Sequence, residues 1–338
     1  MKKIKFNSNS LLLLITILLF AGMYTAGCIV YIDKGFWHFQ TFLNILIGNA
    51  GLICIACGLT CVMLTAGIDI SVGSLVALDC MIMAVGVEQW GIKSPVLMVG
   101  ILLFGILFGS VQGFCVAYLK IQPFIVTMAG MFFARGLTAV ICKEQVSITK
   151  DAFLTSLSNS KITMPFGSYV NSKGMVQVPY IRISVVVALI VLILVFLLLR
   201  YTRFGRSLYA VGGSQQSAAL MGLNVRRTTM LAYVFSSFLC SIGGICYVLN
   251  TMCGTATQAI GLEMDGISSA VIGGTLLTGG VGNVIGSFFG VLINGTISSL
   301  VKTNGKLVSS WSNVVTAALL CFFILLQAVF AKVKARKK

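Results

Sequence analysis

Long apolar segments are the feature of this sequence that most restricts its fold. A helix needs about 20 mostly apolar residues to cross a bilayer, and hydrophobic residues make up 58% of the chain while charged residues make up only 9%. Soluble domains carry about 25% charged residues. We therefore predict an all-α polytopic membrane protein with one domain, residues 1–338. Its ten predicted spans, of which the third and eighth are short, are 11–31, 43–66, 71–87, 95–118, 123–142, 181–199, 228–249, 265–278, 283–300 and 311–331.

The basic residues predict how these spans are oriented. Lysines and arginines bracket the apolar segments, so the net charge of +16 is interpreted as an orientation signal and not as a nucleic-acid surface. Ten spans place both termini on one side, and lysine and arginine favour that side by fourteen to nine, which predicts cytoplasmic termini. A basic loop at 200–227 is then cytosolic, and a polar loop at 143–180 lies outside. The N-terminal apolar run resembles a secretory signal, but its length favours an uncleaved first span.

Two glycine-containing stretches interrupt the apolar pattern. In "LTAGIDISVGS", residues 64–74, we predict that Gly67 and Gly73 supply unusual backbone angles. Asp69 and Ser71 are predicted N-caps of the next helix, with a role of Asp69 in a solute path as the alternative. "LTGGVGNVIGS", residues 277–287, matches this stretch at five of eleven positions. Two short, glycine-interrupted membrane segments in separate halves are typical of transporters.

The predicted cytosolic loop contains a candidate short helix between clusters of arginine. Gly212 and Gly213 are predicted to break the chain, Ser214 to cap the helix and Gly222 to end it in the left-handed conformation. Two helical turns are marginal in isolation. The helix is therefore expected to dock on a partner, the alternative being an ordinary surface helix.

Three stretches of the chain together resemble a known family. They are "LTAGIDISVGS", "FGRSLYAVGGSQQSAALMGLNVRR" and "GISSAVIGGTLLTGGVGNVIGSFFGVLI". They are similar to the membrane-spanning permeases of ribose-type monosaccharide ABC importers, over roughly residues 45–330. The stretch "QPFIVTMAGMFFARG" is most similar to the permease subunits of galactofuranose-type transporters.

This resemblance implies the partners of the chain. Such permeases sit in the bacterial cell membrane as dimers of identical or paralogous chains, with the monosaccharide path between them. A cytosolic ATP-binding subunit drives them, and an extracytoplasmic sugar-binding protein delivers the sugar. This chain would bind no cofactor, since ATP belongs to the partner and no G-x-x-x-x-G-K-[ST] motif is present. The helix expected to couple to the ATPase consists of Ser214, Gln215, Gln216, Ser217, Ala218, Ala219, Leu220, Met221 and Gly222.

Polar residues inside spans are the candidates for the substrate path. Asp79 stands where the family usually has a small residue or threonine, and we predict that it forms a buried pair with Arg135. Contact of Asp79 with sugar hydroxyl groups and a protonated, silent Asp79 are the alternatives. The other candidates are uncharged or lie in the interrupted segment, and hydrogen bonding between helices is their alternative role. They are Asp69, Ser71, Thr127, Asn283 and Asn294.

Two further functions are weighed against the importer. A proton-coupled secondary sugar transporter could use Asp79 or Asp69 as its proton carrier, but it has no need of an arginine-flanked cytosolic helix. An enzyme is not expected, because the single histidine has no sequence neighbour suited to orient it. Cys54, Cys57 and Cys61 have the spacing of one helical face, but without a nearby histidine we expect buried thiols and no metal site.

Overall fold

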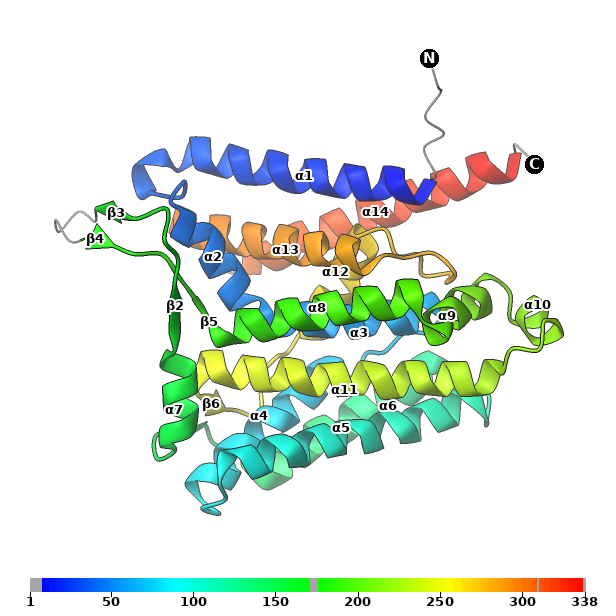
Figure 1. The fold of residues 1–338 in the computed structure, drawn as a ribbon, viewed down its shortest axis with the longest axis horizontal. Coiled ribbons are helices and arrows are strands. Elements are labelled where there is room, and N and C mark those ends of the chain that lie inside the picture. The colour runs from blue at the N-terminus through cyan, green and yellow to red at the C-terminus, as the bar shows by residue number, and fades with distance from the viewer. Residues whose placement is uncertain (1–7, 171–175, 309, 337–338) are drawn as a thin grey trace.

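The computed structural model describes residues 8–170, 176–308 and 310–336, and most of them are helical. The long helices run side by side along one common direction (Figure 1). The helices are α1 (Ser8–Val30), η1 (Ile32–Lys34), α2 (Phe39–Gly48), α3 (Ala50–Leu64), α4 (Val72–Glu88), α5 (Ser94–Ala117), α6 (Pro123–Ile141), α7 (Ala152–Asn159), α8 (Ile183–Tyr201), α9 (Arg203–Gly213), α10 (Gln215–Leu220), α11 (Val225–Thr251), α12 (Leu262–Ile272), α13 (Val284–Asn304) and α14 (Ser310–Arg336).

The predicted spans coincide with helices of this bundle. Within the described residues, seven helices are long and apolar enough to cross a membrane. The pair α2 and α3, bent by 56° at Asn49, makes an eighth if it is counted as one span. The two short predicted spans correspond to α4 and α12, of 17 and 11 residues. The prediction of an all-α polytopic membrane protein is confirmed.

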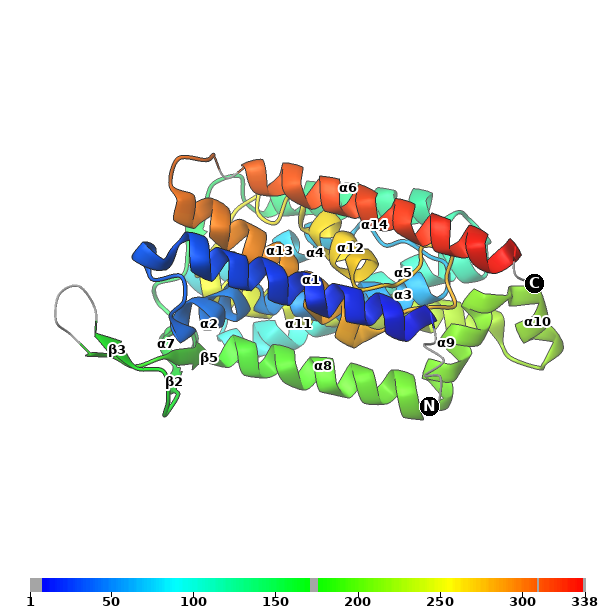
Figure 2. The ribbon, with the colours of Figure 1, turned by 90° about the horizontal axis from the view of Figure 1, so that it is seen from above.

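The centre of the bundle is formed by α3, α4 and α11. Every residue of α3 is buried, and α3 packs against α8, α11, α12 and α13, while α11 also packs against α4 and α5. α1 lies along the outside of α13 (Figure 2). The hydroxyl of Thr16 in α1 donates to the carbonyl oxygen of Ile272 at 2.8 Å. α1 is therefore packed as part of the bundle.

The two ends of the bundle differ. The start of α1, the end of α14 and the pair α9–α10 lie at one end, which we call the α10 end (Figure 1). Short antiparallel strand pairs and α7 lie at the other, the strand end. The pairs are β1 (Val146–Ser147) with β6 (Cys253–Gly254), β2 (Lys161–Thr163) with β5 (Tyr180–Arg182), and β3 (Tyr169–Val170) with β4 (Val176–Gln177).

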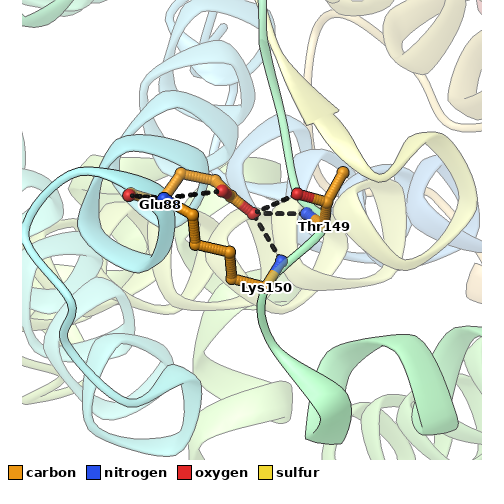
Figure 3. A network of polar contacts seen from close by, with 3 residues as sticks. All are labelled: Glu88, Thr149 and Lys150. Atoms are coloured by element: carbon orange, nitrogen blue, oxygen red, sulfur yellow. Dashed lines mark hydrogen bonds and ion pairs between the residues drawn. The ribbon is translucent and has the colours of Figure 1, made fainter.

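A carboxylate fastens the loop at the strand end to the end of α4 (Figure 3). Glu88 accepts hydrogen bonds from the backbone N–H groups of Thr149 and Lys150, and it pairs with the Lys150 ammonium at 3.5 Å. The Lys150 ammonium also donates to the carbonyl oxygen of Glu88 at 2.9 Å. The N–H donors, that of Thr149 first, lower the pKa of Glu88 below its ordinary value of 4.5.

Acid should loosen this loop. Because the pKa of Glu88 is lowered by folding, its stabilising contribution is complete above pH 4.5 and is lost as the pH falls through the lowered value. We expect the hydrogen-exchange protection factors of the Thr149 and Lys150 amides to drop only below pH 4.5. Glu88→Gln should show the low protection already at neutral pH. Glu144→Gln, in the same loop, serves as the control, and equal effects of the two variants would contradict the assignment.

Candidate functional site: the glycine junction and its polar cluster

The two interrupted segments meet at the α10 end. The N–H of Gly280, in the loop between α12 and α13, donates to the carbonyl oxygen of Leu64 at the end of α3, at 3.0 Å. Gly279 and Gly280 have φ values of +82° and +72°, which favour glycine. A Cβ on Gly279 would lie 2.7 Å from the backbone nitrogen of Ala66. Sequence similarity related the two segments, and the fold makes them touch.

Helix α9 forms the third side of this contact. A Cβ on Gly212 would overlap the carbonyl oxygen of Leu64 and the nitrogen of Gly280, so only glycine fits. The Tyr209 hydroxyl donates to the carbonyl oxygen of Gly282 at 2.9 Å. We call Leu64, Ala66, Gly212, Gly279 and Gly280 the glycine junction. It connects α9 to both helix interruptions through backbone contacts.

The sequence prediction missed α9. Gly212 and Gly213 do not break the chain but are the last residues of α9, and the break follows at Ser214. The prediction was wrong because it took the glycine pair as a source of flexibility, whereas Gly212 provides room for a close approach. Two signals could have revealed the helix: the N-cap Thr202, which accepts from the N–H of Gly205, and the helical spacing of the buried Leu208 and Val211.

The glycines of the first interruption are also required because a side chain would not fit there, and not because the backbone adopts a positive φ. Neither Gly67 nor Gly73 has a positive φ, and the residue that does is Ala66, at +60°. A Cβ on Gly67 would overlap the hydroxyl of Tyr233, and a Cβ on Gly73 would overlap the carboxylate of Glu263. The prediction that α3 ends and α4 begins within a few residues is confirmed.

A buried polar cluster lies beside the glycine junction, with Asp69 at its centre. Asp69 is fully buried, and its Oδ1 accepts from the backbone N–H and the hydroxyl of Ser71 at 3.0 and 2.6 Å. The Ser236 hydroxyl donates to Oδ2 at 3.2 Å. The Gln112 amide donates to the Ser71 hydroxyl at 3.0 Å. Gln112 and Ser236, which the sequence did not single out, therefore join α5 and α11 to this turn.

The prediction that the side chains of Asp69 and Ser71 cap α4 is wrong, because both side chains are engaged in the turn that precedes the helix. Ser71 occupies the N-cap position, but its side chain caps no helix amide because its hydroxyl is engaged by Asp69. Asp69 binds the N–H of Ser71 itself. Thr127 of α6 reaches the same region, donating to the carbonyl oxygens of Pro123 at 2.9 Å and Ile68 at 3.3 Å. Of the predicted path residues, the fold thus brings Asp69, Ser71 and Thr127 together.

The predicted pair of Asp79 and Arg135 does not form. Arg135 donates to the backbone carbonyls of Ala256 and Gln258, at 3.1 and 2.7 Å. Asp79 is fully buried in α4, and neither of its carboxylate oxygens has a hydrogen-bond partner among the described residues. The pairing was wrong because Arg135 holds the loop before α12, whereas Asp79 faces Gly244 of α11.

The two asparagines serve the fold around α13. Asn283 is the N-cap of α13 and accepts from the N–H of Ile285 at 3.0 Å. Asn294 is buried and donates to the hydroxyls of Ser268 and Ser269, both at 2.9 Å, which ties α13 to α12. The contacts of Asn294 correspond to the helix-joining alternative, whereas Asn283 caps its own helix; a role in the path remains a prediction for both residues.

The short helix of the predicted cytosolic loop is present as α10. Ser214 accepts from the N–H of Ser217 at 3.2 Å, and Gly222 has a φ of +80°. The N–H groups of Gly222 and Leu223 close the helix by donating to the carbonyls of Ala219 and Ala218, the pattern of a Schellman motif. Both predicted caps are confirmed. At its tip, Leu220 is 90% exposed and Met221 is 69% exposed.

The cysteines of α3 are enclosed in the core. Cys54, Cys57 and Cys61 are all buried, as predicted. Among the described residues, no group of three or more histidine, cysteine, aspartate or glutamate side chains is placed to hold a metal ion.

Comparison with known proteins assigns the chain to a family. The family described as "Branched-chain amino acid transport system / permease component" matches residues 41–324, and the chain belongs to it. It is therefore the membrane-spanning permease subunit of a transport system, as the sequence resemblance implied. No solved structure matches the chain.

Three similar proteins illustrate this family. The inner membrane ABC transporter permease protein YjfF of Escherichia coli is 38% identical over 321 residues, 94% of this chain and 92% of that protein. The fructose import permease protein FruG of Bifidobacterium longum is 33% identical, covering 91% and 87%. The ribose import permease protein RbsC of Haemophilus influenzae is 32% identical, covering 89% and 87%.

Filling the glycine junction should separate α9 from the helix interruptions. Gly212→Ala is expected to destabilise the protein by about 1–3 kcal/mol, because the new methyl group overlaps two backbone atoms. Gly213→Ala is the matched control, since a Cβ there meets nothing within 4 Å. Thermal unfolding in detergent measures both variants. Equal stability of the two would show that the backbones do not approach as described.

Proposed function

We propose that this chain is the permease subunit of an ATP-driven importer of a monosaccharide. The observation that carries the proposal is the arrangement of α9 and α10, which we call the coupling lever. Its tip exposes Leu220 and Met221, and α9 contacts both helix interruptions at the glycine junction. The relatives named for fructose and ribose import support a monosaccharide as the substrate class. The relative named as an ABC transporter permease favours an ATP-driven importer over a proton-coupled transporter.

The α10 end would face the cytoplasm. Both described chain ends and the loop rich in arginine lie at this end, and lysine and arginine concentrate on the cytoplasmic side of membrane proteins. In this orientation a separate ATP-binding subunit contacts α10, and a sugar-binding protein delivers its sugar at the strand end. ATP is bound by the partner, and this chain supplies no cofactor site.

The ATPase would bind the apolar residues at the end of α10. Leu220, the last residue of the six-residue helix, and Met221, its C-cap residue, are both exposed. Movement of the ATPase would pull α10 and α9, and the glycine junction would pass that movement to the interruptions after α3 and before α13. Rigid backbone contact suits this purpose, because no flexible side chain lies between α9 and Leu64.

The sugar path would run past the polar cluster. A groove of about 560 Å³ lies between α5 and α6, and Gln112 lines it together with apolar side chains. Gln112 thus connects the groove to the Ser71 hydroxyl and Asp69. We place a second permease copy or a paralogous chain against this groove, with Asp69, Ser71, Gln112 and Thr127 available to the hydroxyl groups of the sugar as the cluster opens.

A charge on the tip of α10 should detach the ATPase. Leu220→Asp is expected to abolish co-purification with the ATPase and ATP-dependent uptake. An ionised carboxylate at this position could be buried against an apolar surface of the ATPase only at a large desolvation cost. Val176→Asp is the matched control, an exposed apolar residue at the strand end. Uptake that survives Leu220→Asp, or transport by the purified chain without any ATPase, would refute the proposed function.

Loss of the Gln112 amide should weaken sugar transport. Gln112→Leu is expected to raise the apparent KM for uptake about tenfold, the effect of losing roughly one hydrogen bond to the substrate. ATPase association should be unchanged, since the hydrogen bonds of Gln112 go to Ser71 and not to α10. Phe133→Leu, which lines the same groove, is the control. An unchanged KM would remove Gln112 from the path.

A further inference from the structure

A polar cavity beneath α10 is not used by the function proposed above. Its volume is about 590 Å³, and it lies between α10, the start of α11, the α5–α6 connection and the first helix interruption. Its lining residues are Thr65, Ala66, Gly67, Val116, Ala117, Lys120, Ile121, Gln122, Pro123, Gln215, Gln216, Ala219, Val225, Arg226, Thr229 and Tyr233.

The charges of this cavity are all positive. Lys120 and Arg226 line it, and no aspartate or glutamate does. Among the described residues, the only ion pair is that of Lys150 with Glu88 at the strand end, so neither Lys120 nor Arg226 is neutralised by a carboxylate there. Two unpaired cations on one cavity attract an anion, and arginine in particular matches the oxygens of a phosphate group.

A buried hydroxyl at the base of the cavity lacks a partner. Tyr233 is fully buried, and its hydroxyl forms no hydrogen bond. This hydroxyl lies against Gly67, where a Cβ would overlap it, and Gly67 and Tyr233 both line the cavity. A buried polar group without a partner costs free energy. This hydroxyl has no accessible surface, so Tyr233 closes the base of the cavity and offers no hydrogen bond to a ligand there.

The rest of the polar lining suits a molecule rich in hydroxyl groups. Gln122, Gln215 and Gln216 contribute side-chain amides, and Thr229 contributes a hydroxyl. Amides donate and accept hydrogen bonds, as sugar hydroxyl groups do. We propose that this cavity binds a phosphorylated monosaccharide, with its phosphate toward Lys120 and Arg226 and its hydroxyl groups toward the amides and Thr229. The sugar identity and the cytoplasmic location of the site rest on the proposed function.

Binding here would restrain the coupling lever. Gln215 and Gln216 belong to α10, whereas Arg226 and Tyr233 belong to α11 and Lys120 to the α5–α6 connection. A ligand that contacts all three elements holds α10 in its present position. The phosphorylated form of an imported sugar would thus inhibit further import, since ATP-driven movement of α10 would first have to break these contacts.

The test measures binding to the full-length permease with its ATPase in nanodiscs of neutral lipid. Ribose 5-phosphate and fructose 6-phosphate are the probes, and ribose, fructose and inorganic phosphate are the comparisons. We expect at least one sugar phosphate to bind, inorganic phosphate to bind more weakly and the neutral sugars not to bind. Lys120→Gln and Arg226→Gln should each weaken binding about tenfold, the scale of one charged hydrogen bond. Arg227→Gln, on a residue that does not line the cavity, should leave it unchanged.

Equal binding of neutral sugars, insensitivity to Lys120→Gln and Arg226→Gln, or complete displacement by anionic phospholipid would each overturn the proposal. Failure of sugar-phosphate binding in a complex that still imports sugar refutes this site alone. A complex that imports no sugar refutes the proposed function instead.

Discussion

The hydrogen bond from the N–H of Gly280 to the carbonyl oxygen of Leu64 is the contact on which the rest of this structure depends. A helix that ends inside an apolar bundle leaves carbonyl and N–H groups without partners, and lipid offers none. Here the loop between α12 and α13 supplies an N–H donor to the last carbonyl group of α3. Their meeting is possible because glycine at positions 212, 279 and 280 lets three backbones approach within van der Waals contact.

This constraint also explains where polar residues are tolerated. Asp69 sits in the first interruption because the turn before α4 exposes an N–H group, and Ser71 and Ser236 complete its hydrogen bonds. Asn283 and Asn294 likewise form hydrogen bonds around α13, Asn283 with the N–H of Ile285 and Asn294 with the hydroxyl of Ser268. Asp79 differs, since it is buried without any partner among the described residues. Nothing else in α4 explains why an aspartate stands there.

The glycine junction stabilises the position of α10, which is too short to be stable by itself. A helix of six residues is unstable by itself, yet Ser214 and Gly222 cap it and α9 anchors it to the bundle. Its apolar tip remains exposed. The same arrangement creates the basic cavity between α10 and α11. A partner that moves α10 and a ligand that holds it would therefore act on one element with opposite effects.

The sequence by itself determined where the apolar segments lie, the two interruptions and the caps of α10, because hydrophobic length and cap chemistry are local properties. It predicted ten spans, whereas seven helices of the described residues, or eight with the bent pair, are long and apolar enough to cross a membrane. It did not determine α9, the partners of Arg135 or the reason for Gly67, Gly73 and Gly212. Those depend on which segments approach one another in three dimensions. A glycine reads the same in sequence whether it bends a chain or makes room for another backbone, and only the packed structure decides between the two.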